Sequence, residues 1–276
     1  MTAVTDELIE LRGLRFHYRD WPSTRTGAPT LLLLHGYTGH ARSWDTFARA
    51  MTDRYHVIAL DQRGHGETAW APRDAYGTPE MVADVHAFVA ALGLTGFTLL
   101  GLSMGGLVSI GYAGTRPAGL DRLVIVDIAP EIALSGLKKI RDGVSRSDVF
   151  DTRTDAFARA REDNPIPPEA HQRERVYNSL MRLEDGRWTF RYDRALRDPT
   201  NAREGIAADE GWRLVANINV PTLLVRGSLS DILDAEVAKR MAETLASGSL
   251  IEIPGSGHPV PLDKPDEFLE AVRTFL

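Results

Sequence analysis

Cysteine is absent from the 276 residues of the chain, and its absence excludes disulfide bonds, thiolate nucleophiles and cysteine-ligated metals. No run of lysine and arginine stands out, and 38 acidic against 32 basic residues give a formal net charge of −6. We therefore expect no nucleic-acid partner. No apolar stretch is long enough to span a bilayer, and the acidic N-terminus shows no secretory signal. We expect a cytoplasmic protein without a membrane partner.

Short apolar runs alternate with helix-like patterns over most of the chain. Buried parallel strands have this continuous apolar character because helices cover both faces of their sheet. The alternation predicts an α/β fold with a mostly parallel central sheet flanked by helices. The predicted strands are 30–36, 55–66, 97–103, 120–130, 220–227 and 249–255. The predicted helices are 43–51, 78–92, 104–117, 234–246 and 264–276.

This alternation is interrupted over residues 131–212, a stretch rich in charged residues with a proline-rich turn, DNPIPPEA. It contains helix-like pieces such as HQRERVYNSLMRL and a short segment, DGRWTFRYD, that fits a hairpin or a turn. We predict that residues 1–130 and 213–276 form one α/β core. Residues 131–212 then form a mainly helical cap inserted into that core.

The sequence GLSMG, residues 101–105, joins a predicted strand to the helix that follows. A G-x-S-x-G pattern in this context places serine on a sharp, strained turn, where larger residues at Gly101 and Gly105 would collide with strand and helix. The turn presents Ser103 Oγ at the carboxyl edge of the sheet, where ligands bind in α/β folds. It also directs the Met104 amide toward a developing oxyanion. We predict that Ser103 is a nucleophile; the alternative is a structural serine.

A nucleophilic serine needs a nearby base, because its free hydroxyl is barely nucleophilic at neutral pH. Of the eight histidines, only His258 lies late in the chain in a glycine-bounded loop, GSGHPVPLDKP, after the last predicted strand. We predict that His258 is this base. The residues His35-Gly36-Tyr37 follow the strand TLLLL. The Tyr37 amide is therefore the candidate second oxyanion donor, and we interpret His35 as a residue that fixes its loop.

The motifs HGYTG, DQRGHG, GLSMGG and GSGH resemble those of the α/β-hydrolases, at the intervals of that family, over nearly the whole chain outside the predicted cap. The resemblance implies the α/β-hydrolase fold and a serine, an acid and a histidine in that chain order. DQRGHG resembles the glycine loop after the family's fourth strand, which implies that Asp61, Arg63 and His65 hold this loop and do no chemistry. Neither a metal nor an organic cofactor is implied.

Two aspartates compete as the acid that orients His258 and stabilises its cation. Most of the family places this acid after the strand that ends here at Gly227, typically three residues past the glycine. Ser230 holds that place in this sequence, and Asp231 comes one residue later. Asp127 instead ends the strand that follows the predicted nucleophile's helix.

The segment VDIAP resembles a group of small acyl esterases whose strand ends in Asp-Ile-Ala-Pro and which carry a serine at the later acid position. The layout is also similar to an amidohydrolase of vitamin B6 breakdown that cleaves an acetamide from an enamide dicarboxylate. We therefore favour Asp127 as the acid, with Ser230 as an auxiliary hydrogen-bonding residue. Asp231 is the alternative acid.

These residues predict a serine hydrolase that cleaves a small carboxylic ester, amide or lactone through an acyl-enzyme. Carbon–carbon bond hydrolysis and cofactor-free perhydrolysis are alternatives on the same residues, and a non-catalytic small-ligand receptor is an alternative of another class.

The predicted cap supplies the candidate substrate contacts. Its aromatic residues are candidates for an acyl or aromatic pocket, Trp188 and Tyr177 foremost, and packing within the cap is the other interpretation. The aromatic residues considered are Phe150, Phe157, Tyr177, Trp188, Phe190, Tyr192 and Trp212. Arginines of the cap have the geometry to bind a substrate carboxylate. Because acidic residues are equally numerous there, we interpret the arginines as members of solvated surface pairs. The arginines considered are Arg141, Arg146, Arg182 and Arg187.

Overall fold

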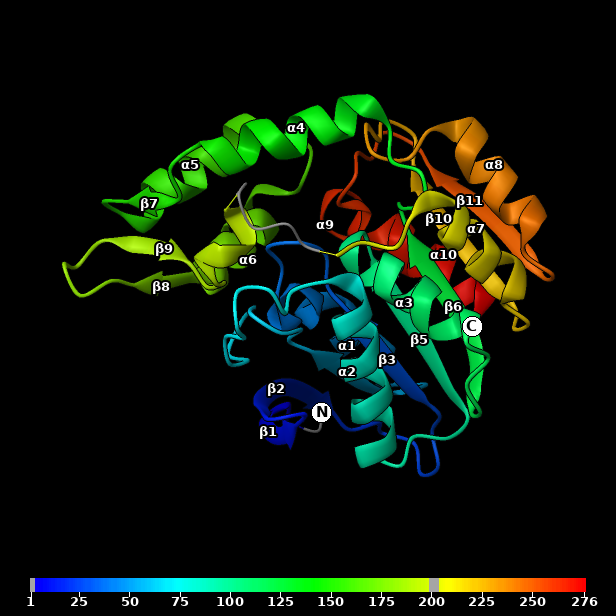
Figure 1. Ribbon diagram of the computed structural model, residues 1–276. Helices are drawn as coiled ribbons and strands as arrows, with labels where there is room; N and C mark the ends of the chain where they lie inside the picture. Colours follow the sequence, from blue (N-terminus) through cyan, green and yellow to red (C-terminus); the bar gives the residue numbers. More distant parts are fainter. Residues whose placement is uncertain (1–2, 199–203) are drawn as a thin grey trace.

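The computed structural model of the protein describes residues 3–198 and 204–276, apart from the side chains at 137, 139–141 and 144. Its centre is a sheet of eight strands in the order β1-β2-β4-β3-β5-β6-β10-β11 (Figure 1). β2 pairs antiparallel with both β1 and β4, and the other neighbouring strands are parallel. In the numbered order, β1 to β6, β10 and β11 span Thr5–Leu11, Leu14–Trp21, Thr30–Leu34, His56–Leu60, Phe97–Leu102, Leu120–Val126, Thr222–Gly227 and Gly248–Ile253.

Successive side chains of each central strand enter opposite apolar layers, because strand side chains alternate between two faces. In β3, Leu32 and Leu34 pack in the layer of α2, α3, α7 and α8, whereas Leu31 and Leu33 pack in the layer of η1, α1, α9 and α10. All four leucines are fully buried, and each contributes about 1.5–3 kcal/mol to folding by leaving water. The mostly parallel α/β sheet predicted from the apolar runs is therefore confirmed. The first layer's helices span Thr78–Ala91, Met104–Gly114, Ala208–Asn217 and Ala235–Thr244, and the second's span Ala41–Trp44, Asp45–Met51, Val260–Asp263 and Pro265–Phe275.

Between β6 and α7 the chain leaves the sheet and forms a group of elements at residues 134–197, called the insertion below (Figure 1). Tyr37 Oη donates a hydrogen bond to Leu196 O at 2.7 Å, and Asn164 Nδ2 donates to Asp263 Oδ1 at 2.7 Å. These bonds join the insertion to the segments that follow β3 and β11, so it covers the carboxyl edge of the sheet. Its elements are α4 (Leu134–Ser145), β7 (Val149–Phe150), α5 (Arg153–Asp163), α6 (Glu169–Ser179), β8 (Leu180–Arg182), β9 (Trp188–Phe190) and η2 (Arg194–Arg197).

Helix α7 belongs to the core layer, although the predicted boundary at residue 212 falls inside it. Val215 is fully buried in the same apolar layer as α3. Gly114 of α3 packs directly against Leu214, since a Cβ added at Gly114 would lie 2.7 Å from a Leu214 methyl carbon. The acidic residues at the start of α7, AADEG, resemble the charged stretch before it. Because the composition does not change there, the sequence does not show where the insertion ends and the core resumes.

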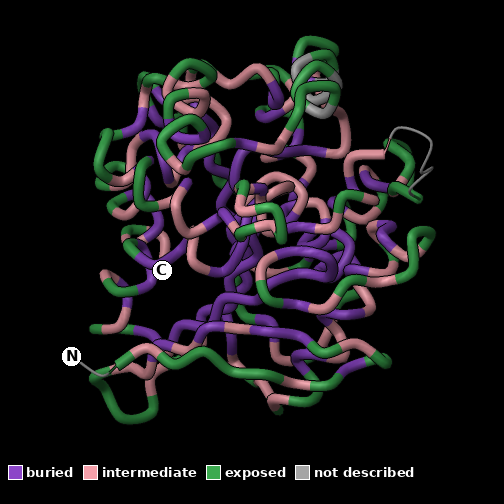
Figure 2. The backbone as a smooth tube through the Cα atoms, turned by 90° about the vertical axis from the view of Figure 1, so that its left-hand side faces the viewer, coloured by how far each residue is buried: buried purple, intermediate pink, exposed green. Residues whose placement is uncertain are grey.

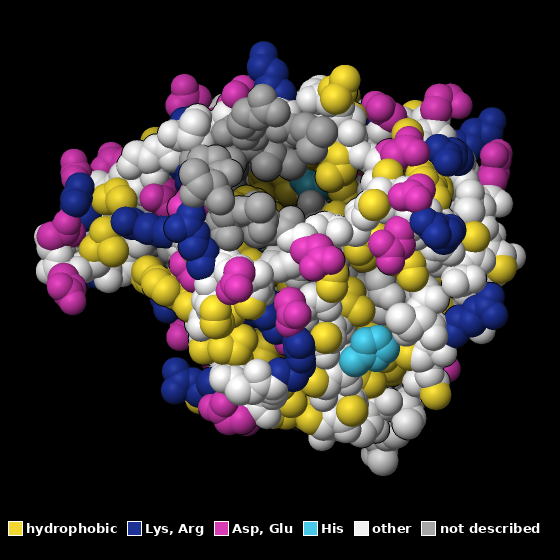
Figure 3. All heavy atoms as spheres, viewed as in Figure 1, with side chains coloured by type: hydrophobic (Ala, Val, Ile, Leu, Met, Phe, Trp, Pro, Cys, Tyr) yellow, Lys and Arg dark blue, Asp and Glu magenta, His cyan; other side chains and the backbone are white. Residues whose placement is uncertain are grey.

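The buried segments gather at the centre of the molecule and the exposed ones at its rim (Figure 2). On the face seen in Figure 3, basic and acidic side chains are interspersed, and the surface is hollowed between the insertion and the core. Within the described residues, no helix combines the length and the apolar character needed to cross a bilayer.

Candidate active site

Ser103 lies on a strained turn between β5 and α3. Its backbone angles are φ 53° and ψ −116°, a conformation that residues other than glycine seldom adopt. The flanking glycines are required sterically: a Cβ at Gly101 would lie 2.2 Å from Gly105 O, and a Cβ at Gly105 would lie 2.5 Å from Leu34 O. Ser103 N donates to Val126 O at 3.0 Å, which ties the turn to β6. The turn therefore fixes the serine hydroxyl at the carboxyl end of β5.

His258 connects Ser103 with Asp127. Its Nε2 lies 2.9 Å from Ser103 Oγ, and its Nδ1 lies 2.7 Å from Asp127 Oδ2. Because a carboxylate only accepts hydrogen bonds, Nδ1–H donates to it and Nε2 is left to accept from the serine hydroxyl. The loop that carries His258 is fixed by Gly257 N, which donates to Asp263 Oδ2 at 2.7 Å.

Asp127 follows β6 with a positive φ of 54°, which turns its side chain toward the loops after β10 and β11. Oδ1 accepts a hydrogen bond from Gly227 N at 2.9 Å. Oδ2 accepts from Ser230 Oγ and faces His258 Nδ1. The carboxylate is fully buried, and these three donors replace the water that burial removes.

The alternative acid, Asp231, lies elsewhere. Ser103 and Asp127 occupy both ring nitrogens of His258, so neither nitrogen is left for Asp231. The Asp231 carbonyl oxygen accepts a hydrogen bond from Ser135 Oγ at 3.0 Å. The structure thus brings the favoured aspartate to His258, and not the alternative.

The loop after β3 contacts the serine through its backbone. A Cβ built on Gly36 would lie 3.3 Å from Ser103 Cβ. His35 Nε2 accepts from Gln62 N at 3.0 Å, which leaves Nδ1–H to donate to Gly36 O at 2.8 Å. Burial lowers the pKa of His35 to about 4, so its ring is neutral at pH 7. His35 therefore holds the loop that precedes Tyr37, as the sequence predicts.

Met104 is the first residue of α3, and the first N–H groups of a helix have no acceptor within the helix. Tyr37 follows the glycine that contacts the serine. Met104 directly follows Ser103, and Tyr37 directly follows Gly36. Because Gly36 and Ser103 are in contact, both predicted oxyanion donors belong to residues next to this contact.

The glycine loop after β4 is held by its own polar residues. Asp61 Oδ2 contacts His17 Nδ1 at 2.7 Å and accepts from Glu67 N at 2.9 Å. Burial alone would raise the pKa of Asp61, but the hydrogen bond from His17 and nearby histidines lower it to about 2. Arg63 donates twice to Asp84. These contacts agree with the structural role inferred from DQRGHG.

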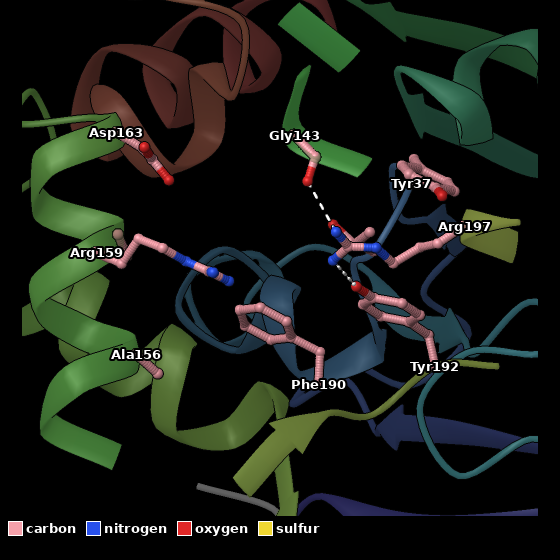
Figure 4. Close-up of a pocket in the computed structure, with 10 residues that line it drawn as sticks. Tyr37, Gly143, Ala156, Arg159, Asp163, Phe190, Tyr192 and Arg197 are labelled. Carbon is pink, nitrogen blue, oxygen red and sulfur yellow. Dashed lines mark hydrogen bonds between the residues drawn. The ribbon is translucent and has the colours of Figure 1, made fainter. Parts of the chain in front are cut away.

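A cavity of about 270 Å³ begins at Tyr37 and extends beneath the insertion (Figure 4). Phe190 and Tyr192 stack on its wall with ring centroids 6.0 Å apart. Arg159 points into it (Figure 4), and Arg197 donates to Tyr192 Oη at 2.9 Å. Phe190 and Tyr192 are among the cap aromatics that the sequence offers as pocket candidates, but their spacing does not separate cavity aromatics from buried ones, and the two arginines were not considered.

Trp188 and Tyr177 do not line this cavity. They pack against the insertion's own apolar cluster, around Phe150 and Phe157. The Arg153 guanidinium lies 4.0 Å from the Tyr177 ring centroid and 5.4 Å from that of Trp188. These two large aromatics therefore contribute to the insertion's own apolar cluster, and their contact with substrate stays a prediction.

Exposed arginines of the insertion form surface ion pairs, as expected. The paired side chains of Arg146 and Asp163 are each about half exposed, so such a pair contributes at most about 1 kcal/mol. The side chain of Arg141 lies outside the described residues. Further contacts of exposed arginines are the ion pairs Arg173–Glu169 and Arg187–Asp185 and a hydrogen bond from Arg182 to the carbonyl of Gly186.

Comparison with known proteins identifies the family of the fold. A family model described as the alpha/beta hydrolase fold matches residues 29–265. A 3-hydroxybutyrate-oligomer hydrolase of Cupriavidus necator is 29% identical over 281 residues, which cover 98% of this chain and 96% of that protein. The crystal structure of an alpha/beta hydrolase from Novosphingobium aromaticivorans matches with a TM-score of 0.88 at 28% identity, over 100% of this chain and 98% of that one.

The crystal structure of E-2-(acetamidomethylene)succinate hydrolase matches with a TM-score of 0.87, over 99% of both chains. At 22% identity this likeness shows the fold alone. The family model covers most of the chain, and the predicted fold and the predicted hydrolase class are confirmed. The chain belongs to the α/β-hydrolase fold family.

Proposed function

We propose that the protein is a serine hydrolase that cleaves a small carboxylic ester through an acyl-enzyme, with Ser103, His258 and Asp127 as its catalytic triad. The observation that carries the proposal is the continuous hydrogen-bonded chain from Ser103 Oγ through His258 to Asp127. The names of several relatives, which include an oligomer hydrolase and an esterase of Mycobacterium tuberculosis, support an ester as the substrate.

In the first half of the reaction, Ser103 Oγ attacks the carbonyl carbon of the ester while His258 Nε2 takes the hydroxyl proton. Asp127 stabilises the imidazolium that forms. The amides of Met104 and Tyr37 donate to the oxyanion of the tetrahedral intermediate. Collapse of the intermediate breaks the ester bond, and His258 gives its proton to the departing alkoxide.

In the second half, His258 takes a proton from water, and the resulting hydroxide attacks the acyl-enzyme. The second tetrahedral intermediate collapses, Ser103 Oγ regains the proton from His258, and the carboxylic acid leaves. Apart from the attacking water of the second half, the proposed chemistry uses side chains and backbone amides of this chain.

The insertion acts as a cap in this proposal, and the two flanking parts of the chain, with α7 included in the second, supply the catalytic core. Its tie to the Tyr37 hydroxyl and the cavity that starts at Tyr37 support this role. Pockets for drug-sized ligands are about 300–1,000 Å³, and the cavity of about 270 Å³ therefore suits a small substrate.

Turnover of a panel of short-chain 4-nitrophenyl esters tests the proposal. Ser103→Ala should keep the native circular dichroism spectrum and lower kcat by about 10⁴-fold or more. Ser135→Ala, which changes an exposed serine of the insertion, is the matched control and should retain wild-type activity. Activity of Ser103→Ala within tenfold of wild type contradicts the proposal. Absence of turnover by the wild type on every ester favours a receptor instead.

A further inference from the structure

Arg175, on α6 of the insertion, differs from the surface arginines around it. Its neighbour on the same helix, Arg173, pairs with Glu169. Within the described residues, the Arg175 side chain has neither a hydrogen bond nor an ion pair. It keeps some accessible surface, because it lines a cavity rather than the outer surface.

This cavity adjoins the proposed catalytic residues. Its wall is formed by Arg175 together with His35, Gly39, Ser43, Trp44, Pro261 and Leu262, and by three further residues, Gly36, Leu102 and Pro259. These three residues are the chain neighbours of Tyr37, Ser103 and His258, and consecutive Cα atoms are only about 3.8 Å apart. The cavity volume of about 20 Å³ suffices for a group the size of a water molecule, which is also the size of one carboxylate oxygen.

The charge of Arg175 is poorly compensated by the protein. Burial lowers the pKa of the guanidinium, because a buried cation is poorly solvated by water. The acid that acts on it is Asp263, whose carboxylate is already engaged by Gly257 N and Asn164 Nδ2. No ion pair joins Arg175 to Asp263 in the described structure. An uncompensated buried cation is costly to the fold, and an anion arriving with the substrate would remove that cost.

Arg159 is a weaker candidate for an anion site, although it points into the larger cavity (Figure 4). Its Nη1 donates to Ser147 O, and its guanidinium lies 4.2 Å from the Phe150 ring centroid. These contacts hold Arg159 within the insertion. Arg175 has no such contact in the described structure, and the cavity that it lines is also lined by Leu102 and Pro259, the chain neighbours of Ser103 and His258.

We propose that Arg175 binds a carboxylate of the substrate, so that the preferred substrates are short esters that carry a free carboxylate near the scissile carbonyl. Monoesters of short dicarboxylic acids belong to this class. The cavity has room for one carboxylate oxygen, which can accept a charge-assisted hydrogen bond from a guanidinium N–H. The inference rests on the proposed function, because it places the carboxylate relative to the ester that Ser103 attacks.

The test compares monoethyl succinate with the neutral ester ethyl butyrate, whose hydrolysis is followed by titration of the released acid at constant pH. The measured quantity is the ratio of kcat/KM for the anionic ester to kcat/KM for the neutral one. We expect wild type to favour the anionic ester. Arg175→Gln should lower the ratio by about 10- to 100-fold, the range for a hydrogen bond to a charged group. Arg175→Lys should retain part of the preference.

Arg173→Gln is the matched control, because it removes an exposed, paired arginine two residues away; its ratio should equal that of wild type. Melting temperature separates binding from a structural role: Arg175→Gln should melt at or above the wild-type temperature, since it removes an uncompensated charge. A lower melting temperature with equal losses on both esters overturns the proposal.

The outcomes also separate the two proposals. If wild type hydrolyses the neutral ester through Ser103 and does not favour the anionic one, the inference about Arg175 is wrong and the proposed function stands. If wild type hydrolyses neither ester and Ser103→Ala changes nothing, the proposed function is wrong and the inference falls with it.

Discussion

Asp127→Asn removes a charge from the proposed triad and keeps the shape of the side chain. In wild type, Oδ1 accepts from Gly227 N, and Oδ2 faces Ser230 Oγ and His258 Nδ1. Asparagine keeps a carbonyl oxygen for Gly227 and places an NH₂ group against His258 Nδ1. Because this group only donates, Nδ1 must lose its proton and Nε2 must carry it. Nε2–H then points at Ser103 Oγ and has no lone pair with which to take the serine proton.

The expected loss follows from this inverted tautomer and from the missing negative charge beside the imidazolium. The same change in a serine protease triad lowers kcat about 10⁴-fold, which corresponds to about 5.5 kcal/mol of transition-state stabilisation. Asp127 is fully buried behind the histidine and does not touch the substrate. The loss should therefore fall on kcat, with KM nearly unchanged.

Steady-state kinetics on one short-chain ester measure the effect, after circular dichroism has shown that the variants are folded. Asp231→Asn is the matched control and should keep most of the wild-type kcat. Ser230→Ala should fall between the two, because it removes one of three donors to Asp127 and leaves its charge. An active Asp127→Asn together with an inactive Asp231→Asn would refute the assignment of the acid.

Three further changes probe the turn, the buried histidines and the insertion. Gly101→Ala places a methyl group 2.2 Å from Gly105 O, so thermal denaturation should show a loss of at least about 1–3 kcal/mol, and an unchanged melting temperature contradicts the steric account. Burial lowers the pKa of His40 to about 3, whereas an unfolded histidine titrates near 6.5; the unfolded chain therefore binds more protons between these values, and stability falls as the pH falls through this window. His40→Gln should make the decrease in melting temperature between pH 7 and pH 4 smaller, and an equal decrease in variant and wild type rules out this histidine as a cause. Trp188→Ala should lower the melting temperature and slow all esters alike, whereas Phe190→Ala should change the relative rates on esters of different acyl length; the reverse pattern restores Trp188 as a substrate contact.

The residues around the turn could be predicted from sequence because their chemistry is local. Gly101 and Gly105 are required by atoms within a few residues of Ser103 and by the neighbouring strand. The five-residue motif G-x-S-x-G therefore suffices to predict the turn. His258 could be predicted as the base because it lies late in the chain, in the loop that follows the last strand. Asp127 was favoured over Asp231 through a family resemblance, since sequence spacing alone does not show which loop turns toward the histidine.

Other features depend on contacts between distant segments. The β1–β2 hairpin was not predicted, because the inward residues of β2 include His17 and Arg19, which are buried against Asp61 and Asp45. This polar face hides the apolar alternation that identifies a strand. Trp188 and Phe190 are two residues apart, and only the packing of the insertion shows which of them reaches the cavity.

Labelling by a fluorophosphonate probe tests the central claim most directly, because the probe reacts with a serine only when its hydroxyl is activated. Mass spectrometry of the intact protein and of its tryptic peptides measures how many probes attach and where. The account predicts one phosphonyl group, on Ser103, and little labelling in His258→Ala, which leaves the serine without its base. A wild-type protein that stays unlabelled, or that carries the probe on another serine, contradicts the account.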